Sequence, residues 1–149
     1  MPIIELTQGK IALVDDKDYQ RVIDYGLWQY HRQHGYAFKS KPTLYLHQFI
    51  LKTNLQVDHR NHDKLDCRRH NLRVATQTQN IRSRAKWSNT TSKFKGVYWD
   101  KQLLKWRVQI SPDRKRIHLG CFESEIEAAE TYNVAALQYF GEFAELNKI

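Results

Sequence analysis

The chain has few of the residues that stabilise disulfide-rich or zinc-binding folds. Its two cysteines, Cys67 and Cys121, lie far apart and form no C-x-x-C pair, which argues against both a disulfide framework and structural zinc. No apolar run approaches the ~20 residues of a membrane-spanning helix. The opening residues Met1–Glu5 lack the basic, apolar and small-residue order of a secretory signal. We therefore expect a cytoplasmic protein with no membrane partner.

Acidic residues are also scarce relative to basic ones, at 16 against 24, which gives a net charge of +8. Such an excess points to a polyanionic partner such as nucleic acid, although it can also serve solubility alone. The two signs separate near the C-terminus. Residues 93–118 carry eight basic and two acidic side chains, whereas residues 119–149 carry one basic and six acidic. This segregation predicts one module with a basic face and an acidic back.

The C-terminal part has the pattern of a small antiparallel sheet followed by one helix. Three short runs of strand character are separated by turn residues: Phe94–Trp99, Trp106–Ile110 and Arg116–Phe122. Alternation along these runs predicts one apolar face and one basic, hydrogen-bonding face. A capping box at Ser124–Glu127 then opens an alanine-rich helix that stops at Gly141.

These elements, from Ser92 to Asn147, resemble the Apetala-two or ethylene-responsive-factor DNA-binding domain. The resemblance is carried by Phe94–Trp99, Lys105-Trp106, Ile117–Phe122, Glu127–Ala129 and Phe140-Gly141. In that family the sheet lies in the major groove. The resemblance therefore implies that a set of side chains faces double-stranded DNA: Lys95, Tyr98, Arg107, Gln109, Arg116 and His118. Arg and Gln can read guanine and adenine. Tyr98 and His118 stand where the plant pattern usually has Arg and Trp, and a merely solvated strand face is the alternative.

Six of the seven histidines lie between residues 31 and 70, and this region has the pattern of a second module. Two strands joined by a polar, basic loop are predicted, followed by a capping box that opens a helix: Gln56–His59, Asn71–Ala75 and Thr76–Gln79. A helix packed across such a hairpin would bring four polar residues together: Asp58, His59, Asn71 and Asn80.

The chemistry of these four residues is complementary. The carboxylate of Asp58 and the amide oxygen of Asn80 are hard ligands suited to Mg²⁺ or Mn²⁺, and His59 can activate water. Each residue also has a simpler interpretation, since an Asp-His pair can cap a turn and an asparagine is often a turn or cap residue. The joint spacing favours a hydrolytic site.

The same region resembles the HNH endonuclease family of the phage and intron homing type, over Tyr45 to Arg82. The motifs are Tyr45–His47, Val57–His59, Asn71–Arg73 and Thr76–Asn80. The resemblance implies a ββα-metal finger holding one divalent cation. Asp58 and Asn80 would be its ligands, His59 the general base and Asn71 the residue that orients the His59 imidazole. Asn80 stands where the family often has His. We interpret His47, within an apolar stretch, as buried, hydrogen-bonded and structural.

The remaining segments show no catalytic pattern. A hairpin of Ile3–Leu6 and Lys10–Val14, followed by a helix from Asp16 to Tyr25, is predicted to complete the nuclease core or to add a DNA contact surface. The basic segment 81–91 suits a linker whose Arg82 and Arg84 follow the phosphate backbone, or equally a solvated helix end.

We therefore predict an α+β protein with a ββα-metal HNH module at residues 1–80, a basic linker at 81–91, and a three-stranded sheet packed on one helix at 92–149. The predicted function is site-specific, divalent-metal-dependent cleavage of double-stranded DNA by a monomer, with nicking the simpler outcome for one finger. A homing nuclease of a bacterial or phage-infected cell is expected. The alternatives are a catalytically inactive sequence-specific DNA-binding regulator and an RNA-binding protein.

Overall fold

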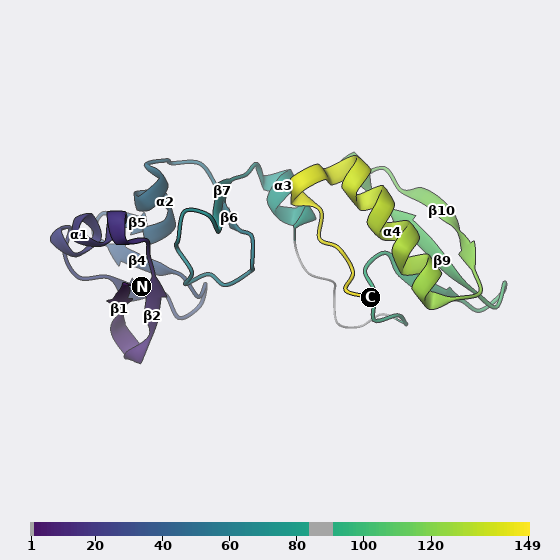
Figure 1. The fold of residues 1–149 in the computed structure, drawn as a ribbon, viewed down its shortest axis with the longest axis horizontal. Helices are drawn as coiled ribbons and strands as arrows, with labels where there is room; N and C mark the ends of the chain where they lie inside the picture. The colour runs from purple at the N-terminus through teal and green to yellow at the C-terminus, as the bar shows by residue number, and fades with distance from the viewer. Residues whose placement is uncertain (1, 84–90) are drawn as a thin grey trace. The chain divides into compact units, whose positions relative to one another are not determined.

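The computed structural model describes residues 2–83 and 91–149 and shows a mixed α+β chain with several small antiparallel sheets (Figure 1). The chain divides into two compact units, residues 1–77 and 78–149. The boundary falls inside helix α3 (Gln77–Arg82), which follows the hairpin of the first unit. The predicted α+β class is confirmed, whereas the ββα-metal arrangement and the three-part division stay predictions.

The first unit is assembled from short elements. In chain order they are β1 (Ile3–Glu5), η1 (Thr7–Gly9), β2 (Ile11–Leu13), α1 (Asp16–Asp24), β3 (Gln29–Tyr30), β4 (Ala37–Ser40), β5 (Thr43–Tyr45), α2 (Leu46–Leu51), β6 (Val57–His59) and β7 (Leu72–Val74). Strands β1 and β2 pair with each other, β4 pairs with β3 and β5, and β6 pairs with β7, all antiparallel. The predicted N-terminal hairpin and the helix after it are confirmed.

The core of the first unit takes one or two apolar side chains from each element. Val14, Val22, Leu46 and Ile50 are completely buried and pack with Trp28. The apolar stretch from Tyr45 to Leu51 folds as the end of β5 and the helix α2, which turns Leu46 and Ile50, four residues apart, to the same side. Because these elements are short, each contributes little apolar surface. Buried polar contacts, described below for the candidate site, supplement the apolar core.

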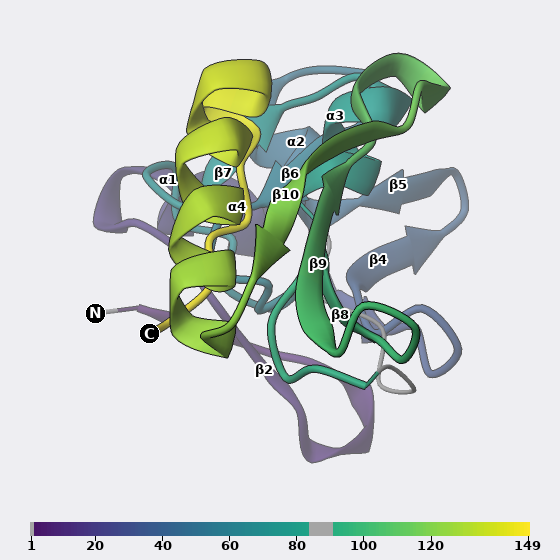
Figure 2. The ribbon, with the colours of Figure 1, turned by 90° about the vertical axis from the view of Figure 1, so that its right-hand side faces the viewer.

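The second unit is a three-stranded antiparallel sheet packed against a long helix, as predicted. Its elements are β8 (Val97–Asp100), β9 (Lys105–Ile110), η2 (Pro112–Arg114), β10 (Ile117–Phe122), α4 (Glu125–Phe140) and η3 (Gly141–Phe143), with strand order β10-β9-β8. Figure 2 shows α4 running alongside β10 and β9. The hydroxyl of Ser124 accepts a hydrogen bond from the Glu127 amide, so the predicted helix start is confirmed.

A close approach between helix and sheet requires glycine at position 96. Gly96 has φ of +75°, and a Cβ atom there would lie 2.1 Å from Cδ2 of Tyr132 on α4 and 2.8 Å from the carbonyl oxygen of Gln109. Along α4, small side chains such as Ala128 and Ala136 are completely buried. Small residues on both sides of this interface therefore allow the helix to lie close to the sheet.

A β-bulge changes which side chains of β10 share a face. The register pairs His118 with Gln109, then Gly120 with Val108 and Cys121 with Arg107, so Leu119 is the extra residue. Leu119 and Phe122 consequently both pack against the apolar core, although they are three residues apart. Cys121 takes the place on the polar face that strict alternation would give to Gly120.

Candidate functional site

The hairpin of β6 and β7 holds three of the four residues predicted for the hydrolytic site. Asp58, His59 and Asn71 are buried, with exposed fractions of 5%, 4% and 3%. In the ladder Asp58 lies opposite Arg73, and His59 lies opposite Leu72. The hairpin therefore buries a carboxylate, an imidazole and an amide, although polar side chains of these kinds are usually at least partly exposed.

The imidazole of His59 lies among aromatic rings. Its centroid is 5.1 Å from that of His47, edge to face, and 5.8 Å from that of Tyr36. Burial lowers the pKa of His59 to about 4, so the ring is neutral at pH 7. Among the described residues, its Nε2 atom is buried without a hydrogen-bond partner. A neutral ring with an unpaired nitrogen can accept a proton.

His47 is buried as predicted, but the predicted hydrogen bond is not found at one of its two ring nitrogens, Nδ1. That atom has no hydrogen-bond partner within the part of the chain that the structure describes. Ring contacts surround the side chain instead: Tyr45 stacks on it at 5.4 Å and Tyr36 meets it edge-on at 5.0 Å. Burial lowers the pKa of His47 to about 3, which keeps this ring neutral as well.

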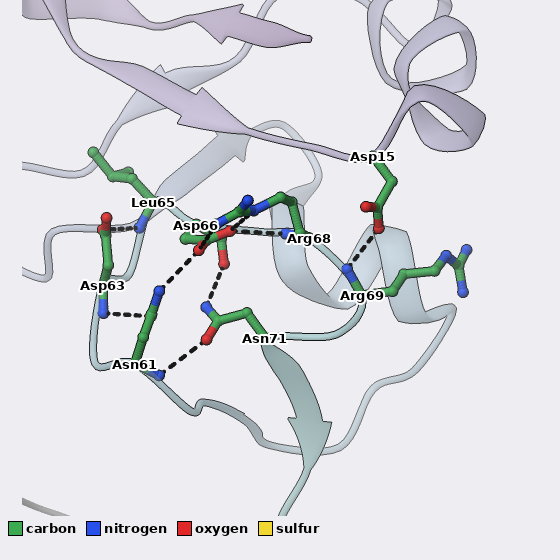
Figure 3. A network of polar contacts seen from close by, with 8 residues as sticks. All are labelled: Asp15, Asn61, Asp63, Leu65, Asp66, Arg68, Arg69 and Asn71. Carbon is green, nitrogen blue, oxygen red and sulfur yellow. Dashed lines mark hydrogen bonds and ion pairs between the residues drawn. The ribbon is translucent and has the colours of Figure 1, made fainter. Parts of the chain in front are cut away.

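Asn71 anchors the loop between β6 and β7 (Figure 3). Its side-chain oxygen accepts a hydrogen bond from the Asn61 amide at 2.9 Å, and its side-chain nitrogen donates to the Asp66 carbonyl at 2.7 Å. Its backbone carbonyl accepts from the Arg60 amide at 2.9 Å. These contacts place Asn71 next to the His59 strand end and give it a loop-holding role; its predicted orientation of the His59 ring stays a prediction.

The loop itself is organised around a buried carboxylate that the sequence analysis did not single out. Asp66 is 1% exposed and accepts hydrogen bonds from the Arg68 guanidinium at 2.6 and 2.7 Å and from the Asn61 side chain at 2.8 Å (Figure 3). The hydrogen bonds of Arg68 hold the pKa of Asp66 below its usual range. An Asp-x-Arg spacing is too common to have identified this pair in advance.

A second buried carboxylate ties the same loop to the helices of the first unit. Asp18 on α1 accepts from Arg69 at 2.7 and 2.9 Å and from Arg21 at 2.9 Å. Both guanidiniums also donate to the Ile50 carbonyl of α2. The Arg69 amide donates to Asp15 at 2.7 Å (Figure 3). Charged contacts therefore fix the loop that carries Asn71.

Asp58 has a cationic partner of its own. Nε and Nη2 of Arg73 both donate to Oδ2 of Asp58, at 2.8 and 2.6 Å, and only 10% of the Arg73 side chain is exposed. Arg73 was not among the residues predicted for the site. Its position follows from the register of the two strands, which sets this arginine directly across from Asp58 and which the sequence alone does not determine.

Asn80, the second predicted metal ligand, lies on α3 beyond the boundary of the first unit. It is half-buried, and its backbone carbonyl accepts a hydrogen bond from the Ser83 hydroxyl at 3.0 Å. Within residues 2–83 and 91–149, no group of three or more His, Cys, Asp or Glu side chains is arranged to hold a metal ion. Cation binding by Asp58 and Asn80 stays a prediction.

Four of the residues predicted to contact DNA share the polar face of the second unit. The Tyr98 hydroxyl donates to the Gln109 side-chain oxygen at 3.3 Å, and Nε of Arg107 donates to Nδ1 of His118 at 3.4 Å. The register places Tyr98 opposite Arg107 and Gln109 opposite His118. The bulge adds Cys121 to this face, with its sulfur 3.7 Å from Nε2 of His118. DNA contact by this face stays a prediction.

The other predicted DNA-contacting residues are placed differently. Lys95 precedes β8, its backbone amide and carbonyl bond to the Asn147 side chain, and burial lowers the pKa of its amine. Arg116 is exposed and immediately precedes β10. Arg84 and the side chain of Arg82 lie outside the described residues. Their DNA contacts also stay predictions.

Parts of the chain are similar in sequence to known proteins. Residues 51–82 match the family model described as HNH endonuclease. This segment contains the β6–β7 hairpin, its loop and α3. The chain is also 33% identical over 114 residues to an uncharacterized HNH endonuclease of Acanthamoeba polyphaga mimivirus, a match covering 70% of this chain and 57% of that protein.

A second relative is an ethylene-responsive transcription factor of Arabidopsis thaliana. It is 37% identical over 65 residues, which are 44% of this chain and 14% of the plant protein. The chain therefore spans less than two thirds of the length of either relative. None of the helices in the described ranges is long and apolar enough to span a bilayer.

Proposed function

We propose that the chain is a DNA endonuclease that hydrolyses phosphodiester bonds at the β6–β7 hairpin. The observation that carries this proposal is the buried Asp58-His59 strand end, where the Nε2 atom of a neutral imidazole has no hydrogen-bond partner among residues 2–83 and 91–149. A buried polar nitrogen without a partner costs free energy, which a hydrogen bond to a bound water molecule would offset. The match of residues 51–82 to the HNH endonuclease family supports the same function.

In the proposed reaction, His59 is the general base. A water molecule attacks the phosphorus atom, and Nε2 of His59 takes the proton that this water loses. One new P–O bond forms as the bond to the leaving sugar oxygen breaks, and the leaving oxygen is then protonated from solvent. A base in this position typically contributes about 10² to 10⁴ in rate.

The two residues predicted as metal ligands have the chemistry that a hard divalent cation prefers. The Asp58 carboxylate already has a cationic partner in Arg73, and the amide oxygen of Asn80 is a second hard donor. We propose that these two residues hold one Mg²⁺ or Mn²⁺ ion. When bound, the ion would supply positive charge for the negative charge that develops on the phosphate and the leaving oxygen.

We propose that the second unit binds DNA and thereby positions the proposed nuclease site of the first unit on it. Its polar face offers Arg107, Gln109, Tyr98 and His118 along two paired strands, a mixture suited to phosphates and base edges in the major groove. Joining a DNA-binding unit to a nuclease raises the local concentration of the nuclease near the target sequence. Site-specific nicking by a monomer, as in a homing enzyme, is the form of the activity that we propose.

The test is a time course on supercoiled plasmid carrying a selected binding site, with Mg²⁺ or Mn²⁺. Wild type should convert the plasmid to open circles, while His59→Ala and Asn80→Ala should be slower by about 10² or more. His70→Ala is the matched control, because His70 is an exposed histidine in the same loop and should leave the rate unchanged.

Two other results would change the proposal. Linear product at early times would indicate paired cuts and would overturn nicking by a monomer. Binding without cleavage in either metal would overturn the nuclease function and favour the alternative, a catalytically inactive DNA-binding regulator. Competition by structured RNA more effectively than by duplex DNA would favour the RNA-binding alternative.

A further inference from the structure

The ion pair between Asp58 and Arg73 joins a proposed metal ligand to a cation that belongs to the protein. Two donor atoms of Arg73, Nε and Nη2, converge on one oxygen, Oδ2, at 2.8 and 2.6 Å. The two side chains are 6% and 10% exposed, so water screens their attraction weakly. The carboxylate proposed to bind a divalent ion is therefore held by a competing positive charge.

The pairing is built into the sheet. Asp58 and Arg73 are direct partners in the β6–β7 ladder, and cross-strand partners have Cβ atoms about 5 Å apart. A guanidinium is cationic, so it competes with a metal ion for the carboxylate. The contact thus follows from the hairpin register and not from a chance rotamer.

We propose that Arg73 is an internal competitor for the cation site, whose guanidinium must leave Oδ2 of Asp58 before a divalent cation binds there. This inference rests on the proposed function, because it takes Asp58 as a cation ligand. Part of the binding free energy of the cation is used to break two charge-assisted hydrogen bonds. Arg73 therefore sets the cation concentration at which the site fills.

The experiment measures Mn²⁺ affinity by electron paramagnetic resonance on the full chain without DNA, so that no cleavage is needed. Arg73→Gln removes the competing charge and should tighten Mn²⁺ binding at least about tenfold, a factor equivalent to about 1.4 kcal/mol. Arg68→Gln is the matched control, since Arg68 makes a similar ion pair with Asp66 in the same unit and should leave the affinity nearly unchanged.

Two further variants keep the test decisive. Arg73→Lys retains the positive charge but has only one side-chain nitrogen, so it should tighten Mn²⁺ binding less than Arg73→Gln does. If circular dichroism shows that Arg73→Gln is unfolded, the lysine variant takes its place in the test. Asp58→Asn locates the ion and should abolish the tight binding, both alone and combined with Arg73→Gln.

The outcomes separate the two proposals. If Asp58→Asn weakens Mn²⁺ binding but neither Arg73 variant binds more tightly than the Arg68→Gln control, the competitor role is overturned and the proposed cation ligand stands. If Asp58→Asn leaves Mn²⁺ binding unchanged, the ion does not use Asp58, which overturns this inference and the cation assignment together. Plasmid cleavage by the wild type tests the nuclease function separately.

Discussion

The two units are held together in different ways. The first unit fixes its hairpin loop with buried carboxylates, because Asp18 and Asp66 bind arginines from the loop. The second unit packs apolar residues such as Val108 and Ala136 between one sheet and one helix, and it leaves polar groups on the outer face. A reaction site needs groups removed from water, whereas a reading surface needs them exposed. The contrast matches the functions proposed for the two units.

The largest predicted effect tests the close helix packing of the second unit. Gly96→Ala should destabilise this unit by about 4 kcal/mol, because the new Cβ would clash with the Tyr132 ring and would strain a positive-φ residue. Hydrogen exchange measured by mass spectrometry should show the loss in residues 91–149 and not in the first unit. Gly141→Ala is the control: Gly141 also has positive φ, but a Cβ atom there would meet no other part of the described chain within 4 Å, so this variant should cost about 2 kcal/mol. Equal losses in the two variants would contradict the packing argument.

A prediction of intermediate size compares the stability lost when one hydrogen-bonding asparagine is removed from each unit. Asn71→Ala should destabilise the first unit by about 2 kcal/mol, because it leaves the Asn61 amide and the Asp66 carbonyl without their partner. Asn147→Ala removes similar bonds to Lys95 in a more exposed setting and should cost about 1 kcal/mol. Urea unfolding followed by exchange in each unit would measure both. A larger loss for Asn147→Ala would mean that burial does not set the cost.

A smaller effect is expected in acid, where the first unit should lose stability at a higher pH than the second. Hydrogen bonds from Arg69 lower the folded-state pKa of Asp18, and those from Arg68 lower that of Asp66. The stability that these pairs add is complete above the ordinary pKa of 3.8 and is lost as the pH falls through the lowered folded-state pKa. Exchange measured from pH 5 downward should show the first unit opening before the second. Asp18→Asn should be less stable at pH 5 and should depend less on pH, and a pH dependence equal to that of wild type would count against the assignment.

The smallest predicted effect concerns the polar face. Arg107→Gln should weaken binding to a selected duplex about fivefold to tenfold through the loss of one charged contact, as measured by fluorescence anisotropy at fixed salt. Lys95→Gln removes the same charge from a residue beside Glu145 and Asn147 and should weaken binding less. If Lys95→Gln has the larger effect, the DNA-binding surface is not this face of the sheet.

Local sequence signals were sufficient for most of the secondary structure. The hairpin at the N-terminus, the helix that begins at Asp16, the three strands of the second unit and the Ser124 cap all appear as predicted, because turn residues, alternation and capping act within a few residues. The burial of the Asp58-His59 pair at a strand end is consistent with the predicted motif. The start of β8, three residues after Phe94, shows the usual shift at an element boundary.

Tertiary contacts decided the features that carry the site. The register of β6 and β7 placed Arg73 opposite Asp58. In the folded loop, the side-chain oxygen and nitrogen of Asn71 both form hydrogen bonds with loop residues. In the second unit, the bulge at Leu119 lets both Leu119 and Phe122 pack against the core, and it brings Cys121 to the polar face. These outcomes depend on partners distant in sequence, whose competition for hydrogen bonds and buried space is settled only when the chain folds. Local patterns therefore determined the elements, and long-range packing determined the environment of each polar side chain.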